Sequence, residues 1–404
     1  MSTGQLLELD AQYGAQIYHP LPVVFSKAKG AEVWDPEGRR YIDFLSAYSA
    51  VNQGHCHPRL LAALQAQAER STLPSRAFQN DVWPVFADRL HRLFGYERAL
   101  PMNTGAEAVE TAVKLARRWA YDVKGVAPNS AVLLCATGCF HGRTLLCISL
   151  SSDPDSYGGF GPFVPGIAKV PYDDLPALEQ VLEAQGKQVC GFLVEPIQGE
   201  AGILVPRDGY LRGAAALCRK HNALLIADEI QTGLGRTGKM LCHQWEGIRP
   251  DVVLLGKALS GGILPVSVVL ADDSIMSTIK AGQHGSTYGG NPLGAAVAIA
   301  ALDVLVEEGL CERAEVLGRR FRSEVASIAA PCVSAIRGKG LLNAVDIDHS
   351  KGRTAWQICE QLKENGLLAK PTHEKSIRFA PPLILSDAQM TESLEIIAKT
   401  FRGQ

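Results

Sequence analysis

The stretch Asp251-Val-Val-Leu-Leu-Gly-Lys-Ala-Leu-Ser-Gly-Gly262 decides which fold and which chemistry this sequence supports. Val252 to Leu255 is a short apolar run, which is typical of a buried strand. Gly256 ends the run, and Lys257 follows at once. Burial at a strand end lowers the pKa of a lysine and favours its nucleophilic amine, which can form a Schiff base with a carbonyl compound.

Two other interpretations of Lys257 compete with the nucleophile. The first is an exposed lysine in a strand-to-loop turn, since most lysines have no perturbed, functional amine. The second is a phosphate-binding Walker loop, which the sequence excludes. Ala258 follows Lys257 where Ser or Thr is required, and Asp251 stands where the leading glycine should be. Lys257 alone therefore leaves the choice between nucleophile and surface residue open.

A second apolar run, Leu224-Leu-Ile-Ala-Asp-Glu-Ile-Gln231, ends in an acid, Asp228. A buried strand end gives Asp228 three possible partners: a helix N-terminus, a basic side chain, or the protonated nitrogen of pyridoxal phosphate (PLP). If the two strands are parallel neighbours, their carboxyl ends meet at the edge where ligands bind in open α/β sheets. Asp228 and Lys257 would then lie together, and this pair favours PLP.

Composition and charge narrow the class of protein. The chain has 404 residues and is 47% hydrophobic, so it can bury the core of two domains. A net charge of −2 without a basic block argues against a nucleic-acid partner. The apolar stretch Pro292 to Leu302 is too short to span a membrane. Residues 1–10 lack the basic region of a targeting peptide, and ten irregularly spaced cysteines indicate a reducing compartment. We therefore expect a cytoplasmic protein.

The hydrophobic pattern predicts an α/β fold. Strand-like runs alternate with helical patterns between about residues 100 and 270, which predicts a mostly parallel, seven-stranded-type sheet with helices on both faces. After about residue 293, helices and strands mix as in a smaller α+β domain. The first 30 residues have no clear periodicity and are expected to be irregular. The expected organisation is an N-terminal arm and hairpin (1–50), a large domain (51–292) and a small C-terminal domain (293–404).

One predicted helix start is a candidate anion site. Met102 to Ala116 has helical spacing, and Thr104 with Glu107 forms a capping box. The N–H groups of Gly105 and Ala106 then lack helical partners, and the helix dipole favours an anion there. An ordinary helix start explains the pattern equally well, and the charge of Glu107 opposes a phosphate.

Several other polar or aromatic residues are candidates for ligand contacts. Hydroxyls of Ser286 and Thr287, in a glycine-rich loop, could bind phosphate. Phe140 could stack on a planar cofactor, and Arg143 could hold a carboxylate through two hydrogen bonds. Arg378, on a predicted strand, could face the site. Core packing, a surface salt bridge and a cross-strand charge are the respective alternatives for Phe140, Arg143 and Arg378.

Two motif matches carry no function in our interpretation. His55, Cys56 and His57 are too close together to converge on one ion, and no ligand-spaced partners follow, so no metal is expected. Gly233 to Gly238 matches the dinucleotide pattern G-x-G-x-x-G. We reject it because Lys239 to Glu246 is poorly patterned for the helix that the motif requires.

Taken together, these segments resemble class III, fold type I, PLP-dependent aminotransferases, and within them the ornithine aminotransferases. The matching segments are Asn52–Pro58, Pro101–Gly105, Val194–Gly202, Ile226–Gly233, Leu254–Gly262, His284–Pro292 and Lys370–His373. The resemblance extends along nearly the whole length of the chain. The class depends on the Lys257 and Asp228 motifs, and the subfamily on Tyr18, Tyr48, Glu200 and the Lys-Pro-Thr-His segment.

The resemblance implies roles around the cofactor ring. Lys257 would hold PLP as a Schiff base and later move the proton. Asp228 would keep the pyridine nitrogen protonated, and Gln231 would approach the ring hydroxyl. Phe140 would stack on the ring. His141 stands next to it, where many relatives have tryptophan and other class III enzymes also have histidine.

The resemblance also implies a site shared between two subunits. Gly105 and Ala106 would bind the cofactor phosphate together with Ser286 and Thr287 of the partner subunit. A homodimer is therefore the expected minimum assembly.

The implied reaction transfers the δ-amino group of L-ornithine to 2-oxoglutarate, giving L-glutamate 5-semialdehyde and L-glutamate. Arg143 would bind the carboxylate distal to the reacting centre, and Tyr18 and Tyr48 would help to place ornithine. Arg378 would bind the α-carboxylate of 2-oxoglutarate or glutamate. With ornithine, Glu200 would pair with Arg378 and mask its charge.

Three alternatives remain open from the sequence. The first is a class III aminotransferase for another ω-amine, such as acetylornithine, 4-aminobutyrate or lysine. The second is an aminomutase of the same fold, which needs no 2-oxoglutarate. The third is a binding protein without catalysis, which the presence of both Lys257 and Asp228 disfavours.

Overall fold

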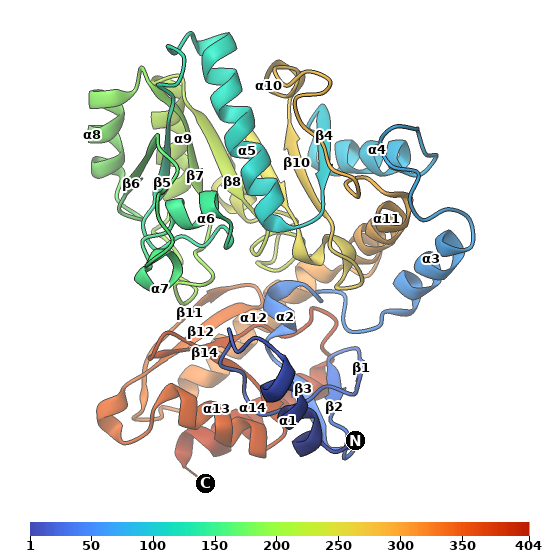
Figure 1. Cartoon of the computed structure of the whole chain (residues 1–404). Coiled ribbons are helices and arrows are strands. Elements are labelled where there is room, and N and C mark those ends of the chain that lie inside the picture. The colour runs from blue at the N-terminus through green and yellow to red at the C-terminus, as the bar shows by residue number, and fades with distance from the viewer. Residues whose placement is uncertain (404) are drawn as a thin grey trace.

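The computed structural model describes residues 1–403, which form two parts stacked one above the other (Figure 1). The upper part is built around a seven-stranded sheet, and the lower part contains two four-stranded sheets and both chain ends. The short helix α2 (Ser46–Ser49) lies where the two parts meet.

The seven-stranded sheet has the order β4-β10-β9-β8-β7-β5-β6. Its strands are β4 (Arg98–Met102), β5 (Val132–Ala136), β6 (Ile167–Val170), β7 (Val189–Val194), β8 (Leu224–Asp228), β9 (Val252–Leu255) and β10 (Ser267–Ala271). Neighbours from β6 through β9 pair in parallel, whereas β10 is antiparallel to both β9 and β4. The prediction of a mostly parallel sheet with helices on both faces is confirmed.

Alternate residues of these strands enter different cores, because successive side chains of a strand point to opposite faces. Leu133 packs with α5 (Gly105–Trp119) on one face, and Leu134 packs with α8 (Leu175–Gln185) and α9 (Tyr210–Lys220) on the other. The remaining helices of this part are α3 (Pro58–Ala68), α4 (Trp83–Phe94), α6 (Leu145–Leu150), α7 (Pro154–Tyr157), α10 (Asp273–Met276) and α11 (Pro292–Glu307).

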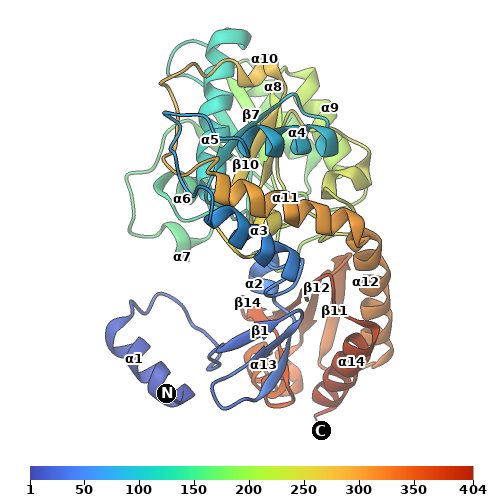
Figure 2. The same ribbon diagram turned by 90° about the vertical axis from the view of Figure 1, so that its right-hand side faces the viewer.

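The lower part holds an antiparallel sheet of order β11-β12-β15-β14. Its strands are β11 (Val333–Lys339), β12 (Leu342–Ile347), β14 (Lys370–Thr372) and β15 (Ser376–Phe379). Helices α12 (Leu310–Ser327), α13 (Ala355–Glu364) and α14 (Asp387–Arg402) pack around it (Figure 2).

The N-terminal hairpin belongs to the lower part. Strands β1 (Lys27–Lys29), β2 (Glu32–Trp34) and β3 (Arg40–Asp43) form a sheet that β13 (Leu367–Leu368) completes, and β3 pairs with β13 in parallel. Segments from the beginning and from the last tenth of the sequence thus share one sheet, and Figure 2 places both chain ends in the lower part.

The expectation of an irregular N-terminus is wrong for residues 3–13, which form α1 (Thr3–Tyr13). A capping box between Ser2 and Gln5 starts this helix. No apolar stripe marks this helix in the sequence, because none of its residues is buried. In Figure 2 the helix stands apart from the rest of the lower part.

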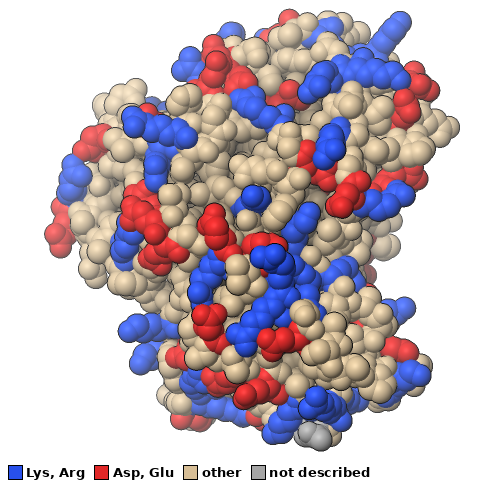
Figure 3. Space-filling view, turned by 180° about the vertical axis from the view of Figure 1, so that it is seen from behind, with Lys and Arg blue, Asp and Glu red and all other residues tan. Residues whose placement is uncertain are grey.

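The helices and the surface charges show whether the chain has features of a membrane or nucleic-acid partner. Over residues 1–403, none of the helices combines the length and apolarity that crossing a membrane requires. On the face drawn in Figure 3, basic and acidic side chains are interspersed rather than gathered into one field of a single sign.

Arg236 joins segments from three regions of the chain. Its side chain is fully buried, and it donates to the carbonyls of Leu341 (2.9 Å) and Pro381 (2.7 Å) and to Oδ1 of Asn52 (2.5 Å). Burial lowers the pKa of Arg236 to about 9. The glycine-rich segment Gly233–Gly238 thus has a structural task here, and no long helix follows it.

We expect Arg236→Met to destabilise the fold by about 3 kcal/mol, because it leaves buried carbonyl groups without donors. Urea unfolding measures this free energy. The matched control is Arg92→Met, whose exposed side chain pairs only with Asp88, and it should cost less than about 0.5 kcal/mol. Equal stability of the two variants would contradict the assigned role of Arg236.

Candidate active site

Parallel pairing of β8 with β9 brings the two key residues together. Asp228 is the last residue of β8 and pairs in register with Leu254, just before Gly256 and Lys257. Because both strands run in the same direction, Asp228 and Lys257 leave the sheet at the same edge. The predicted neighbourhood of these two strands is confirmed.

A cavity of about 190 Å³ opens at this edge. The residues that line it are Gly105, Ala106, Phe140, His141, Gly142, Glu195, Asp228, Ile230, Gln231 and Lys257. Seven of these were predicted site residues, and they come from the ends of three strands, β5, β8 and β9, and from the start of α5.

Lys257 lines this cavity. Its backbone has a positive φ of 45°, in a 3-10 turn directly after the strand. Burial lowers the pKa of its amine, although the nearby carboxylates of Glu200, Asp228 and Glu195 act in the opposite direction. A lowered pKa increases the fraction of neutral, nucleophilic amine at neutral pH.

Asp228 is held by two hydrogen bonds from neighbouring residues of the cavity. Its Oδ1 accepts the N–H of Ile230 (3.1 Å), and its Oδ2 accepts from Nδ1 of the buried His141 (2.6 Å). An ionised carboxylate has about four acceptor positions, so Asp228 can still accept from a pyridinium nitrogen.

The protonation of His141 follows from its neighbours. Burial alone would lower the pKa of His141, but Cys139 and Asp228 together raise it well above its usual value. The pKa of the Cys139 thiol is itself raised, first by the Cys135 side chain and then by burial, so its sulfur is neutral at neutral pH. The hydrogen bond to Asp228 is therefore the cause that favours a protonated His141.

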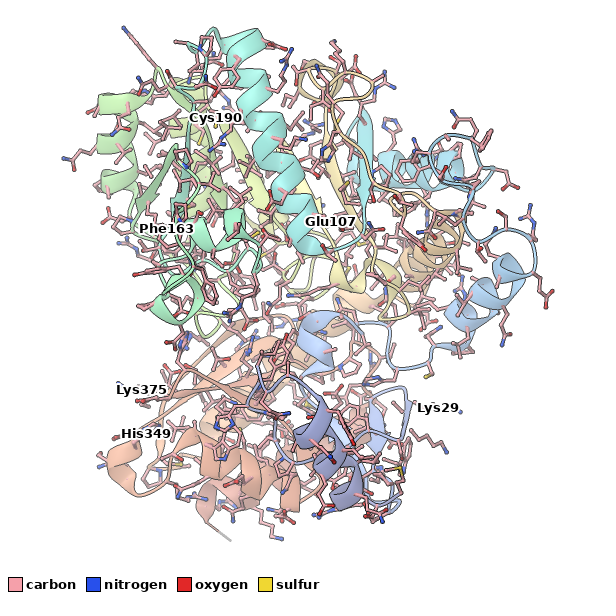
Figure 4. The ribbon with its side chains drawn as sticks, viewed as in Figure 1. Lys29, Glu107, Phe163, Cys190, His349 and Lys375 are labelled. Carbon is pink, nitrogen blue, oxygen red and sulfur yellow. The ribbon has the colours of Figure 1, made fainter. Side chains whose placement is uncertain are left out.

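The start of α5 has the geometry expected for an anion site. Oγ1 of Thr104 accepts the N–H of Glu107 (3.2 Å), and the Glu107 carboxylate accepts the N–H of Thr104 (2.6 Å). Figure 4 shows Glu107 at the end of α5 that faces the lower part. Gly105 and Ala106 line the cavity, and their N–H groups, as the first of the helix, have no intrahelical partners.

Glu200 and Arg378 form an ion pair next to the cavity. Nη1 of Arg378 lies 2.6 Å from Oε1 of Glu200, and the same oxygen accepts from Nε2 of Gln231 (3.2 Å). Burial alone would raise the pKa of Glu200, but the guanidinium outweighs it and the pKa is lowered. Gln231 thereby connects the ion pair to the cavity that Lys257 occupies.

Tyr48 packs against this ion pair. The guanidinium of Arg378 lies 4.7 Å from the centre of the Tyr48 ring. Tyr48 belongs to α2, where Ser46, Ala47, Tyr48 and Ser49 all have positive φ values. Such left-handed backbone is costly for residues with a Cβ, and it concentrates at functional sites.

Seven of the predicted residues do not line the cavity. Three of them, Tyr48, Glu200 and Arg378, form the ion-pair cluster described above, and the other four are Arg143, Tyr18, Ser286 and Thr287. Arg143 is exposed, with its guanidinium 5.7 Å from the centre of the Phe140 ring. Tyr18 is 76% exposed on the N-terminal arm. Ser286 accepts from Nδ2 of Asn103 (2.9 Å), and Thr287 is exposed.

His55 and His57 each pair with a carboxylate instead of converging. Nε2 of His55 lies 2.8 Å from Asp43, and Nε2 of His57 lies 3.3 Å from Glu308. No group of three potential metal ligands occurs among residues 1–403.

Glu195 is a cavity residue that the sequence analysis missed. It directly follows β7, and its carboxylate accepts the N–H groups of Phe140 (2.9 Å) and Gly199 (3.2 Å). Burial raises the pKa of Glu195 to about 7. The signal was present, because Glu195 ends an apolar run in the same way as Asp228 does.

Comparison with known proteins agrees with this geometry. The family model described as aminotransferase class-III matches residues 13–401. The ornithine aminotransferase of Emericella nidulans is 57% identical over 98% of this chain and 89% of its own.

The chain belongs to the class III aminotransferase family.

Two solved structures of related aminotransferases superpose closely. A Toxoplasma gondii ornithine aminotransferase, with PLP partly occupying its active site, has a TM-score of 0.96 at 48% identity, over 99% of this chain and 94% of its own. The acetylornithine aminotransferase of Elizabethkingia anophelis has a TM-score of 0.91 at 48% identity, with both chains fully covered. The predicted family and fold type are confirmed.

The residues of this class III aminotransferase fit PLP, its cofactor. Lys257 offers an amine to the aldehyde, and Asp228 an acceptor to the pyridine nitrogen. Phe140 lines the cavity with an aromatic ring, and the N-terminus of α5 offers N–H groups to a phosphate.

We expect Lys257→Met to stabilise the PLP-free protein at neutral pH by on the order of 1 kcal/mol, since it removes a buried amine. The folded state binds fewer protons than the unfolded chain between the lowered pKa and the ordinary 10.5. Stability of the parent protein therefore rises with pH in that window, and the advantage of Lys257→Met should shrink towards pH 10.5.

Thermal unfolding of both proteins from pH 7 to pH 10 measures this difference. Lys187→Met, which removes an exposed lysine, is the control. A difference that grows with pH would show that the amine of Lys257 is not destabilised by burial.

Proposed function

We propose that this chain transfers the δ-amino group of L-ornithine to 2-oxoglutarate, giving L-glutamate 5-semialdehyde and L-glutamate. The observation that carries the proposal is the Glu200–Arg378 ion pair beside the Lys257 cavity. Such a pair lets one site accept first a substrate with an amine at the reacting end and then one with a carboxylate there.

Bound PLP supplies an electron sink for the carbon that carries the transferred amine. Lys257 holds the cofactor and then moves the proton at that carbon, since a lowered pKa increases the fraction of its amine that can accept a proton. Asp228 keeps the pyridine nitrogen protonated, and the bond from His141 fixes the orientation of its carboxylate.

The first substrate, ornithine, has no carboxylate near its reacting δ-carbon. Ornithine presents its δ-amine to Lys257 and its α-carboxylate to Arg143, at the far end. Tyr18 and Tyr48 complete the contacts of ornithine. Glu200 neutralises Arg378 during this half, so the amine meets no free cation.

The second substrate needs Arg378 unmasked. 2-Oxoglutarate places one carboxylate beside its reacting carbonyl, and Arg378 receives it when Glu200 swings aside. Among residues 1–403, none accepts a hydrogen bond from the buried Nε of Arg378, so the guanidinium has an unused donor besides its bond to Glu200. A planar fork of donors suits a carboxylate.

The assembly that we propose is a homodimer with shared active sites. Thr287 is exposed and Ser286 lies outside the cavity of its own chain, which is compatible with a contribution to the phosphate site of a partner subunit. Tyr288, the next residue, is a large exposed aromatic at 58%, as expected of a surface that another subunit covers.

We also propose a cytoplasmic location. Its support is that all ten cysteines are free, as in proteins of reducing compartments.

Stopped-flow absorbance tests the proposed function directly. The PLP form is mixed with L-ornithine, N-acetylornithine, 4-aminobutyrate or L-lysine, without an oxo-acid. We expect rapid loss of the PLP absorbance with ornithine, followed by its recovery with 2-oxoglutarate.

Each other outcome has a defined meaning. Faster conversion with N-acetylornithine or another ω-amine would keep the family and replace the substrate. No conversion with any amine would indicate an aminomutase or a binding protein instead. Lys257→Ala, which should lose about a thousandfold or more in rate, is the control for catalysis by this site.

We expect Glu200→Ala to favour glutamate over ornithine, because Arg378 would then be permanently unmasked. The ratio of the two single-turnover rate constants should shift by roughly 10- to 100-fold towards glutamate. Single-turnover measurements with each amino donor give this ratio. An unchanged ratio would refute the masking role of Glu200.

A further inference from the structure

The loop that carries Glu200 is short and tightly closed. Gln198 and Leu204 exchange two backbone hydrogen bonds (3.2 and 3.0 Å), and the N–H of Gly202 reaches the carbonyl of Gly199 (3.2 Å). Ile203 is fully buried and has a positive φ of 56°. Contacts that hold residues 199–203 therefore also fix the position of Glu200.

Arg337, on β11 in the lower part, holds the far end of this loop. Its Nε lies 3.0 Å from the carbonyl oxygens of both Gly202 and Ile203, and its Nη2 lies 2.5 Å from that of Gly202. One guanidinium thus binds two consecutive carbonyls of the Glu200 loop across the boundary between the two parts.

The guanidinium of Arg337 is itself fixed on the lower sheet. Its Nη1 and Nη2 donate to the two carboxylate oxygens of Asp346 (2.5 and 2.9 Å), and Nη2 lies 3.1 Å from Oγ of Ser376. Burial alone would raise the pKa of Asp346, but Arg337 and Ser376 outweigh it and lower the pKa. A two-pronged Arg–carboxylate pair fixes orientation as well as charge.

The sheet places this anchor next to Arg378. Register pairs Arg337 with Ala344 and Ala344 with Arg378, so the two arginines share one cross-strand row. Strand spacing puts their Cα atoms about 10 Å apart on the same face. Ser376 and Arg378 also share a face of β15, because they are two residues apart.

The Glu200 loop therefore contacts the lower sheet at two positions. Glu200 meets Arg378, and two residues further on Gly202 meets Ser376 and Arg337. Gly202 has a φ of +101°, and a Cβ there would lie 3.0 Å from Oγ of Ser376. The close approach of the loop to β15 thus requires glycine at this position.

We infer that Arg337, anchored by Asp346 and Ser376, is a positioning residue that holds the Glu200 loop so that Glu200 masks Arg378. Arg337 thereby sets how readily the ion pair opens for a substrate carboxylate, and with it the balance between the two substrates. The inference rests on the proposed function, because that function gives the ion pair its masking role.

The test uses the PLP-loaded enzyme and an unreactive dicarboxylate, glutarate. Calorimetry gives the dissociation constant of glutarate, and single-turnover kinetics give the ratio of the rate constants for glutamate and ornithine. The proteins compared are the parent, Arg337→Met, Glu200→Ala and the double variant.

Loosening the loop should unmask Arg378 in part. We expect Arg337→Met to tighten glutarate binding and shift the ratio towards glutamate by at least about fivefold, the lower end of typical coupling between sites. In the Glu200→Ala background the same change should have no further effect, since no mask remains to be positioned.

Arg353→Met is the matched control for a purely structural role. Arg353 also lies in the lower part and donates to main-chain carbonyls, those of Thr400 (2.7 Å) and Phe401 (2.9 Å), but it does not reach the Glu200 loop. It should lower thermal stability without changing the ratio.

Two results would overturn the inference. One is a ratio and a glutarate affinity that stay at the parent values in Arg337→Met. The other is an effect of equal size in the Glu200→Ala background, which would show that Arg337 acts elsewhere. If Arg337→Met fails to fold, Ser376→Ala removes one bond of the anchor, and an unchanged ratio there is equally decisive.

A failure of the proposed function can be distinguished from a failure of this inference. A parent enzyme that ignores ornithine but converts another ω-amine would change the substrate. The coupling between Arg337 and Glu200 would still be measured by glutarate affinity, which depends on no amine donor.

Discussion

Two parallel strands, β8 and β9, bring a carboxylate and an amine to the same edge of one sheet. The rest of the active site depends on this pairing. Strands β7 and β5 run parallel to β8 and end at the same edge, so Glu195, after β7, and the Phe140 loop, after β5, reach the cavity from neighbouring positions. Reversing a single one of these strands would move its terminal residue to the opposite edge of the sheet.

Buried charge is the second constraint. Lys257, Asp228, Glu195, Glu200 and Arg378 lie within a small volume, where unpaired charges are costly. The protein meets this cost in different ways. Asp228 receives a hydrogen bond from His141, Glu195 receives two backbone N–H groups, and Glu200 is paired with Arg378. Because the Glu200–Arg378 pair must open during turnover, the loop that carries Glu200 needs a fixed position, and we propose that Arg337 provides it.

Much of the fold was predictable from the sequence, because its core elements follow simple burial patterns. The runs ending at Asp228 and before Lys257 are apolar throughout, as buried parallel strands must be. The helix after Thr104 was predictable from its capping box and apolar spacing. Helix α1 was not, because it buries nothing and therefore has no apolar stripe. Its start is held by the capping box of Ser2 and Gln5 and by hydrogen bonds from Thr3 to Glu37. Glu195 could have been predicted by the rule applied to Asp228.

The sequence by itself determined the family, the reactive lysine and its acidic partner, because these residues sit in local patterns that a strand end requires. Only the tertiary structure decided how distant segments meet. The contact of Arg337 with the Glu200 loop joins residues more than a hundred positions apart, and no local pattern marks either end of it. The same holds for Arg236 and its carbonyl partners. Every residue has a main-chain carbonyl, so the residue type does not mark which carbonyl accepts a hydrogen bond. Only the folded structure shows it.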